Sequence, residues 1–202
     1  MIPQSGGMRR FQRSLYVFNI IFLGLLFFTA GMAKLFPGHR FPGLMGPVWL
    51  EDRLLEYGLG GFARFIAHAQ VVIGYLLITW RYRWLGSLML APMLLNILAI
   101  TISQDWRGTP WVVGFFLMQL TYVFWVDRRQ YLHLVIADAA APESVSVRKN
   151  SAWLLMVGLG LVMLSIGLSR VSVEAGWAVC AVGLGAGVVS VVWIRTNPVE
   201  KA

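Results

Sequence analysis

The chain alternates between long apolar runs and short polar segments. Six apolar runs lie at about residues 14–36, 62–80, 84–103, 110–126, 151–169 and 175–194. Runs of about 18 apolar residues or more are typical of helices that cross a bilayer. Pro37 and Gly38 end the first run, and Pro110 stands at a favourable first-turn position of the fourth. The pattern therefore predicts an all-α, polytopic membrane helix bundle with six transmembrane helices.

Composition agrees with a membrane protein. Of the 202 residues, 58% are apolar and 13% are charged, and the mean hydropathy is +0.69. A soluble domain carries about a quarter charged residues. The net charge of +8 comes from basic residues in short clusters beside the apolar runs, not from one basic face. The expected partner is therefore the lipid bilayer, and nucleic acid is excluded.

The distribution of basic residues predicts the topology. With the N-terminus inside, eleven of the 17 Lys and Arg residues fall in cytoplasmic segments and six fall outside. This bias predicts that both termini lie in the cytoplasm. The first apolar run is longer than the ~7–15 residues of a signal-peptide core, which favours an uncleaved first helix. The expected location is the bacterial cytoplasmic (inner) membrane, as a multi-pass protein.

The polar segments divide the chain into five parts. We expect a cytoplasmic tail (1–13), a four-helix transmembrane bundle (14–137), a cytoplasmic linker (138–150), a C-terminal transmembrane hairpin (151–195) and a second tail (196–202). Residues 48–57 read as a short interfacial helix outside the membrane, with an ordinary surface helix as the alternative.

The last two apolar runs are rich in glycine. Small residues let helices approach closely, and two of these glycines form a GxxxG pair. They predict either a hairpin that packs on itself or a docking surface for another membrane subunit. The candidate interface residues are Gly158, Gly160, Gly176, Gly183 and Gly187.

No catalytic or metal-binding motif is visible. The single cysteine, Cys180, excludes an internal disulfide and a CxxC site. The three histidines lack metal-ligand spacing, and no nucleotide-binding or nucleophile motif is present. We therefore predict no catalytic residue, no metal site and no evident cofactor, apart from a quinone or a lipid as candidate ligand.

Several polar side chains are predicted to lie at one depth beneath the outer surface. Counting at about 1.5 Å per residue places four of them roughly 10–12 Å deep, and three more nearer the surface. They predict either hydrogen bonds between helices or a small pocket that binds the head of a quinone, lipid or other amphiphile. The deeper four are Thr29, Gln70, Asn96 and Gln119, and the outer three are Lys34, His68 and Asp105.

Lys34 is the charged residue of this set whose role is least obvious. Lysines near helix ends often reach to the membrane surface as anchors. Alternatively, Lys34 faces inward and forms an ion pair with Asp105, because such a pair lowers the cost of two charges near hydrocarbon.

The first apolar run carries a family resemblance. FLGLLFFTAGMAKLFPG (residues 22–38) resembles the first-helix signature of the DoxX-like family, and AHAQVVIGYLLI and LLNILAI continue the similarity to about residue 127. The resemblance implies a four-helix membrane bundle, as in the DoxD subunit of thiosulfate:quinone oxidoreductase and in the protein MauE. Many members carry a glutamate near the position of Gln70. The amide here, and the added hairpin, depart from the family pattern.

Three functions remain open from the sequence. The first is a non-catalytic membrane subunit or assembly factor of a larger, energy-transducing complex. The second is a membrane component of a quinone-linked oxidoreductase with a polar head-group pocket. The third is a carrier of a small molecule or lipid.

Overall fold

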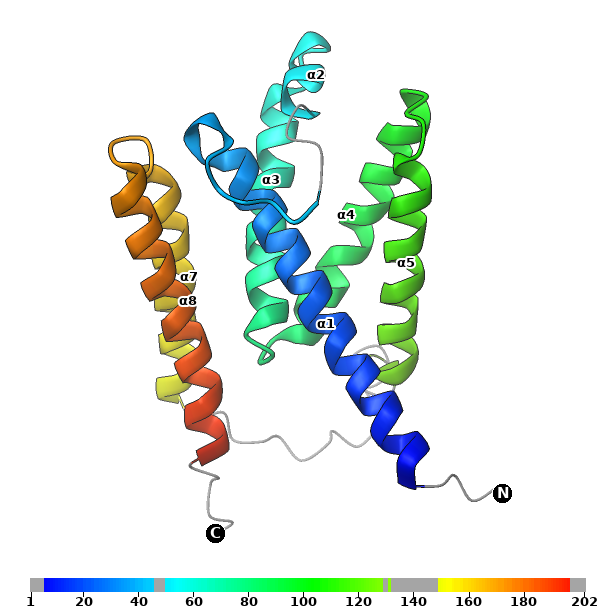
Figure 1. Ribbon diagram of the computed structural model, residues 1–202, viewed down its shortest axis with the longest axis vertical. Helices are drawn as coiled ribbons and strands as arrows, with labels where there is room; N and C mark the ends of the chain where they lie inside the picture. The colour runs from blue at the N-terminus through cyan, green and yellow to red at the C-terminus, as the bar shows by residue number, and fades with distance from the viewer. Residues whose placement is uncertain (1–5, 46–49, 129–130, 132–148, 197–202) are drawn as a thin grey trace.

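The computed structural model describes residues 6–45, 50–128, 131 and 149–196, and this part of the chain is helical with no strand (Figure 1). The elements are α1 (Gly6–Leu35), the short 3₁₀ helix η1 (Pro37–His39), α2 (Leu50–Glu56), α3 (Gly60–Ile78), α4 (Arg83–Ser103), α5 (Thr109–Val126), α7 (Lys149–Leu168) and α8 (Val173–Thr196).

Five of the described helices are long and apolar enough to cross a membrane. These segments are Phe11–Leu35, Gly60–Ile78, Arg83–Ser103, Thr109–Val126 and Val173–Val192, whereas the apolar part of α7, Ala152–Leu168, is shorter. The all-α class is thus confirmed, and the five candidate spans agree with a multi-pass membrane protein, against the six predicted. The short helix expected at 48–57 forms as α2. The predicted linker and C-terminal tail lie almost wholly outside the described residues.

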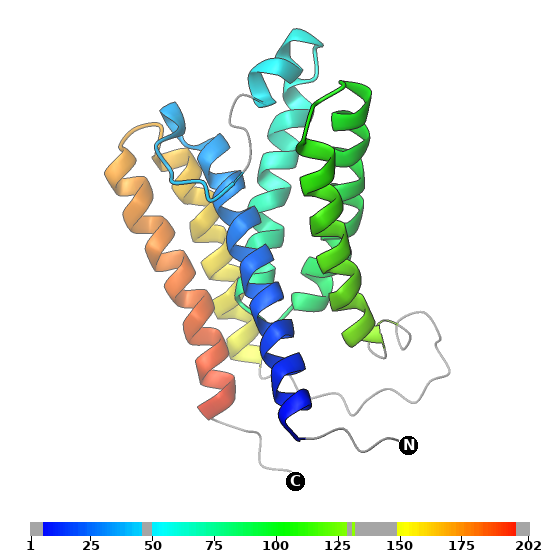
Figure 2. The same cartoon turned by 45° about the vertical axis from the view of Figure 1, so that its right-hand side comes forward.

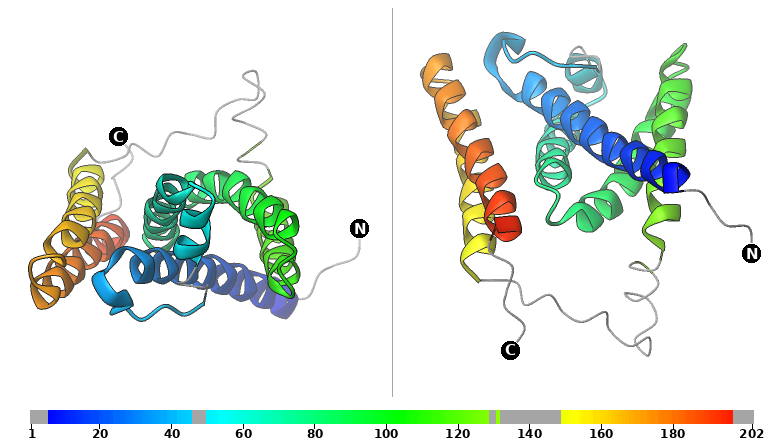
Figure 3. Two further views of the ribbon diagram at one scale, coloured as in Figure 1. Left: turned by 90° about the horizontal axis from the view of Figure 1, so that it is seen from above. Right: turned by 60° about the horizontal axis from the view of Figure 1, so that its bottom comes forward.

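The first four long helices close into a ring. Seen from above, α3, α4 and α5 form an arc that α1 completes, while α7 and α8 lie outside it (Figure 3). A shared apolar core fills the ring, with Ile20 and Leu23 of α1, Leu90 of α4 and Leu120 of α5 all at most 1% exposed. We call the end that carries α2 and the α4–α5 turn the upper end, as in Figure 1, and the opposite end the lower end.

The closest contact in the ring joins α1 to α3. A Cβ added at Gly31 would lie 2.6 Å from the carbonyl oxygen of Ala67, and one added at Gly24 would lie 3.0 Å from the Ile78 amide nitrogen. Gly74 of α3 likewise faces the α1 backbone at Phe28. Glycine at these positions therefore lets the two backbones touch, which fixes the register between α1 and α3.

The α7–α8 hairpin packs beside α3 and the upper end of α1 (Figure 2). The buried hydroxyl of Tyr75 in α3 donates to the carbonyl of Leu155 at 3.1 Å and lies 3.5 Å from that of Gly183. Near the upper end, Phe41 stacks on Trp177 of α8 with ring centroids 4.5 Å apart. One buried hydrogen bond donor and one aromatic stack thus attach the hairpin to the ring.

Most of the hairpin glycines serve contacts within the chain. Gly158 and Gly183 face each other across the α7–α8 contact, and Gly187 packs against Thr79 and the Tyr75 ring. Gly176 packs against Ser169 at the upper turn. Of the five candidate interface residues, Gly160 alone has open space around it. The geometry favours the hairpin that packs on itself, and on α3, over a glycine surface for a partner.

This packing predicts opposite outcomes for two glycines on the same helix. Gly183→Ala places its methyl group 2.7 Å from the Gly158 carbonyl oxygen, so the helices must separate, which costs about 1–3 kcal/mol. Gly185→Ala points into open space and is neutral or slightly stabilising. Thermal unfolding of both variants in mild detergent measures the difference. Equal midpoints for the two variants would contradict the close α7–α8 contact.

Candidate ligand-binding site

A cavity of about 370 Å³ lies at the upper end, among α1, α3, α4 and α5. Its size falls in the lower part of the range of small-molecule sites, about 300–1,000 Å³. Exposed residues at the rim, among them Met45 and Arg107, leave it open at the upper end. The lining consists of Leu26, Phe27, Ala30, Lys34, Met45, Gln70, Leu94, Ile97, Thr101, Trp106, Arg107, Gly108, Thr109, Val112, Val113 and Phe116.

Lys34 and Gln70 form the polar contact in the wall of this cavity. The Lys34 amine donates to the side-chain oxygen of Gln70 at 2.8 Å, and Gln70 is only 4% exposed. The register fixed by Gly31 and Gly74 brings these two residues to the same height. A charged donor on a buried amide makes a strong hydrogen bond and holds the amine against the cavity.

The turn between α4 and α5 supplies the other polar groups of the rim. Thr101 ends the buried face of α4, and Trp106, Arg107 and Thr109 follow within the turn and the start of α5. Positive φ angles at Asp105 (51°) and Gly108 (92°) fold this turn back over the cavity. The rim is therefore rich in hydrogen-bond donors, whereas the walls below it are apolar.

Two of the sequence-predicted residues at the upper end lie outside the cavity. The Thr29 hydroxyl donates to the Leu25 carbonyl at 2.8 Å and accepts from the Leu44 amide at 3.2 Å, so it holds the loop after η1 on α1. His68 is exposed, with Nδ1 2.7 Å from the carbonyl oxygen of Arg64 in its own helix. Thr29, predicted in the deeper polar layer, and His68, predicted nearer the surface, therefore do not line the cavity.

Asn96 does not face the bundle interior as expected. The buried face of α4 includes Met93 and Leu94, and two residues further on a helix turns by about 200°. Asn96 is therefore exposed, and its amide donates to the Pro92 carbonyl at 2.9 Å. This bond within the helix removes the need for a partner on a neighbouring helix.

The predicted ion pair between Lys34 and Asp105 is also wrong. Asp105 is exposed in the α4–α5 turn, and among the described residues its carboxylate does not pair with Lys34. Turn geometry directs Asp105 away from the cavity and Arg107 toward it.

Gln119 lies one turn below Phe116, and its buried amide oxygen has no hydrogen-bond partner in the part of the chain that is described. Lys34 and Gln70 are thus the two candidates that the fold brings together.

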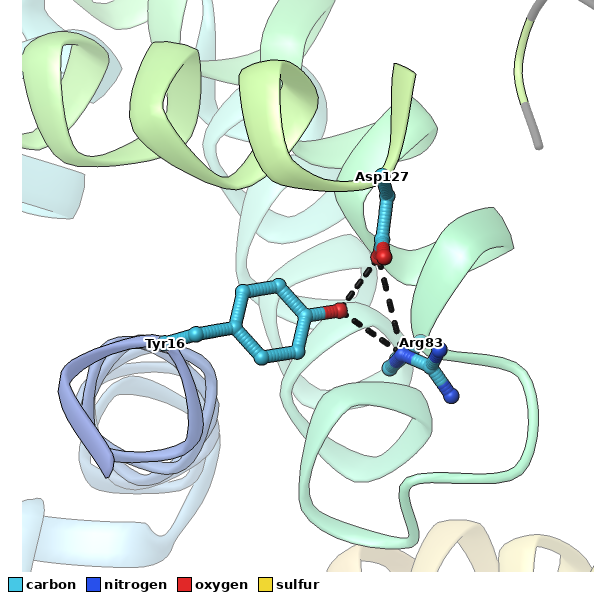
Figure 4. Close-up of polar contacts among 3 residues, drawn as sticks. All are labelled: Tyr16, Arg83 and Asp127. Atoms are coloured by element: carbon cyan, nitrogen blue, oxygen red, sulfur yellow. Dashed lines mark hydrogen bonds and ion pairs between the residues drawn. The ribbon is translucent and has the colours of Figure 1, made fainter. Parts of the chain in front are cut away.

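A second polar cluster, which the sequence did not single out, closes the lower end of the ring (Figure 4). Arg83 Nε donates to the Tyr16 hydroxyl at 2.8 Å and lies 3.5 Å from an Asp127 carboxylate oxygen, and the Tyr16 hydroxyl in turn donates to Asp127. These three side chains come from α1, from the start of α4 and from the residue that caps α5. The cluster ties three helices together at one point.

Trp80 supports this cluster from the α3–α4 turn. Its indole ring lies 5.0 Å from the Arg83 guanidinium carbon and packs edge-on against Tyr16 at 5.8 Å. Trp80 has a φ of 59°, a conformation that costs a non-glycine residue about 1–2 kcal/mol. A cation–π contact and an aromatic contact offset this strain. Beyond α5, burial raises the pKa of Tyr131, whose ring packs on Phe124.

Comparison of the chain with models of known protein families, with curated proteins and with solved structures finds no match. The resemblance to the DoxX-like family accordingly stays a prediction from sequence. Among the described residues, no group of three or more His, Cys, Asp or Glu side chains is placed to hold a metal ion. The cavity and the lower cluster are therefore interpreted from their own geometry.

The sequence contained a signal for the lower cluster. Asp127 is the one acidic residue among the arginines at the predicted inner ends of the four-helix part, namely Arg81, Arg83, Arg128 and Arg129. Pairing of Asp127 with one arginine could have been anticipated. The choice of Arg83, and the inclusion of Tyr16, depend on which residues face one another in the ring.

The lower cluster predicts a specific loss of stability. Arg83→Met leaves the Asp127 carboxylate, in a side chain 11% exposed, without its cation, and we expect a cost of about 1–3 kcal/mol in unfolding free energy. Arg53→Met breaks an ion pair whose side chains are 57% and 62% exposed, so its cost is near zero. Chemical unfolding followed by tryptophan fluorescence compares the two. An equal effect would show that the cluster adds nothing to the ring.

The Lys34–Gln70 contact predicts energetic coupling. Lys34→Met and Gln70→Leu each lower the unfolding free energy, and the double variant loses less than the sum by about 0.5–2 kcal/mol, because both changes remove the same bond. Arg170→Met removes an exposed cation at the α7–α8 turn and serves as the control. Unchanged stability of Lys34→Met would return Lys34 to the role of an interfacial anchor.

Proposed function

We propose that this chain is a non-catalytic multi-pass membrane protein that holds one amphiphile in the upper-end cavity. In this proposal the chain crosses a bacterial cytoplasmic membrane six times, with both termini inside, so the cavity faces the outer side. The observation that carries the proposal is the apolar chamber of about 370 Å³ with a part-buried Lys34–Gln70 hydrogen bond in its wall.

The arrangement of the lining supports an amphiphile rather than a wholly polar or wholly apolar ligand. Polar groups lie at the rim and at the Lys34–Gln70 contact, whereas Leu26, Leu94 and Phe116 line the chamber. A polar head would bond to the rim while its chain is removed from water against these side chains. A quinone, a lipid or another single-chain amphiphile has this division into head and tail.

The closed lower end supports binding near one surface. Tyr16, Arg83 and Asp127 connect α1, α4 and α5 below the cavity, and the apolar core fills the space between. An amphiphile would therefore enter and leave at the upper end. The carrier hypothesis requires this lower cluster to open, which the retention of one ligand does not.

Membership of a larger complex is a second candidate function. A Cβ added at Gly160 of α7 or at Gly185 of α8 would meet nothing within 4 Å, so each helix of the hairpin keeps a glycine with open space around it. A partner helix could approach there. Native gel electrophoresis after extraction in mild detergent tests this role, and migration only as the free chain would count against it.

Blocking the cavity tests the proposed function. Val112→Trp adds an indole at the cavity wall and removes the space for a ligand, whereas Val182→Trp places the same side chain on an exposed part of α8. Native mass spectrometry of the purified chain should show one bound amphiphile in the unchanged protein and in Val182→Trp, and a strongly reduced adduct in Val112→Trp. Equal adducts in all three would mean that the amphiphile binds elsewhere.

A further inference from the structure

We propose that the upper-end cavity opens sideways, between α1 and α5, into the lipid leaflet at that end, and that its ligand is a membrane-dissolved amphiphile whose tail stays in the bilayer. This inference rests on the proposed function, which requires an amphiphile but leaves open its route of entry and the place of its tail. It is carried by the oblique course of α1 and by the side chains on both sides of the opening.

Helix α1 crosses the ring obliquely, so that its lower end lies beside α5 and its upper part lies against α3 (Figure 1). At the lower end, the Tyr122 hydroxyl of α5 donates to the Gln12 carbonyl of α1 at 3.3 Å. Higher up, a Cβ added at Gly31 would lie 2.6 Å from the Ala67 carbonyl oxygen of α3. The close approach at Gly31 therefore holds the upper part of α1 toward α3 and away from α5.

The separation of α1 from α5 begins above one aromatic contact. The Phe27 and Phe116 rings lie edge to face, with centroids 5.9 Å apart, and join the two helices. One turn higher, Ala30 on α1 and Val112 on α5 both line the cavity. Residues three or four positions apart share a helix face, so Ala30 and Val112 face the same gap as the two rings. The helices thus form the sides of an opening whose floor is the aromatic pair.

This opening reaches the outer surface of the ring at apolar side chains. Val112 lines the cavity and is also 39% exposed, and its neighbours Trp111 and Phe115 are 85% and 48% exposed. They belong to the apolar span Thr109–Val126, which in a bilayer is surrounded by hydrocarbon. The top of the cavity, by contrast, is partly covered by the turn that carries Gly108. A membrane-dissolved ligand therefore reaches the cavity from the side.

The cavity volume indicates where the tail of such a ligand lies. A volume of about 370 Å³ is in the lower part of the range of small-molecule sites, so it holds a head group and a short part of a chain rather than a whole lipid. A tail that left the cavity at the top would enter water, which costs free energy for every methylene group. A tail that leaves between α1 and α5 stays in hydrocarbon.

Thiol labelling of the full-length chain in nanodiscs tests the side opening. Ala30→Cys places a thiol in the cavity wall, Ala99→Cys places one at similar depth on the exposed face of α4, and Val171→Cys places one at the exposed α7–α8 turn. Each variant is treated with N-hexadecylmaleimide, which dissolves in the bilayer, and with a sulfonated maleimide, which stays in water. Intact-mass spectrometry measures both rates, and the unchanged chain, whose Cys180 is buried, gives the background.

We expect Ala30→Cys to resemble the lipid-facing control. Its ratio of hexadecyl to sulfonate labelling should lie within about tenfold of the ratio for Ala99→Cys and far above that for Val171→Cys, because thiol reactivity follows access. The hexadecyl product would itself show that a long tail extends outside while its reactive end lies in the cavity. Ile97→Cys, on the α4 wall of the cavity, repeats the measurement if Ala30→Cys is unstable.

Blocking variants connect the labelling to the gap between α1 and α5. Val112→Trp narrows this gap and should slow hexadecyl labelling of Ala30→Cys about tenfold or more. Val182→Trp adds the same indole to an exposed position of α8 and should leave the rate unchanged.

The other outcomes separate the inference from the proposed function. Labelling of Ala30→Cys mainly by the sulfonated reagent, or by neither reagent, overturns the side opening. Hexadecyl labelling that Val112→Trp does not slow shows another route and also overturns it. In each of these cases, a bound amphiphile that Val112→Trp removes in native mass spectrometry keeps the proposed function. If that adduct is missing from the unchanged chain, the proposed function fails and the proposed ligand fails with it, even where the labelling shows the opening.

Discussion

The contact between α1 and α3 is the constraint on which the rest of the structure depends. The contact depends on three glycines that have no side chain to hold the two backbones apart: Gly24 and Gly31 on α1 and Gly74 on α3. Apolar side chains gain little by leaving lipid for one another, so close backbone packing must supply much of the attraction between membrane helices. The same contact sets the register that puts Lys34 beside Gln70. The α1–α3 contact thus positions both the helices of the ring and the polar side chains in the wall of its cavity.

The polar side chains at the two ends of the ring differ in how they are hydrogen-bonded. At the lower end, Tyr16, Arg83 and Asp127 bond to one another, so their polar atoms are used within the protein. At the upper end, the hydrogen bond between Lys34 and Gln70 lies beside an open chamber with further donors at its rim. Buried polar groups are costly without partners. The lower cluster, whose polar groups bond to one another, therefore joins the helices. The upper cavity, whose rim carries hydrogen-bond donors, suits a ligand that supplies acceptors.

The hairpin shows how small residues can be used inside a chain instead of between chains. Gly158 and Gly187 leave room for the Tyr75 hydroxyl, which reaches the backbone carbonyls of Leu155 and Gly183. Tyr75 on α3 therefore contacts both α7 and α8, and the stack of Phe41 on Trp177 adds a second attachment. Gly160 and Gly185 take no part in these contacts and keep open space around them.

The apolar runs by themselves predicted the long helices and their order, and five of the described helices are long and apolar enough to cross a membrane, because length and hydrophobicity are local properties of the chain. Counting residues along the helices placed Lys34 nearer the surface than Gln70, whereas the register between α1 and α3 brings the two side chains into contact. Helix rotation was decided only by tertiary packing, which turned Asn96 outward and joined Tyr16 to Arg83 and Asp127. The geometry of the α4–α5 turn directed Arg107 rather than Asp105 toward the cavity. A weakly amphipathic membrane helix carries little record of which face it buries, because lipid and protein interior are similarly apolar. Rotation is then set by the fit of small residues such as Gly31 and Gly74 against a neighbouring backbone.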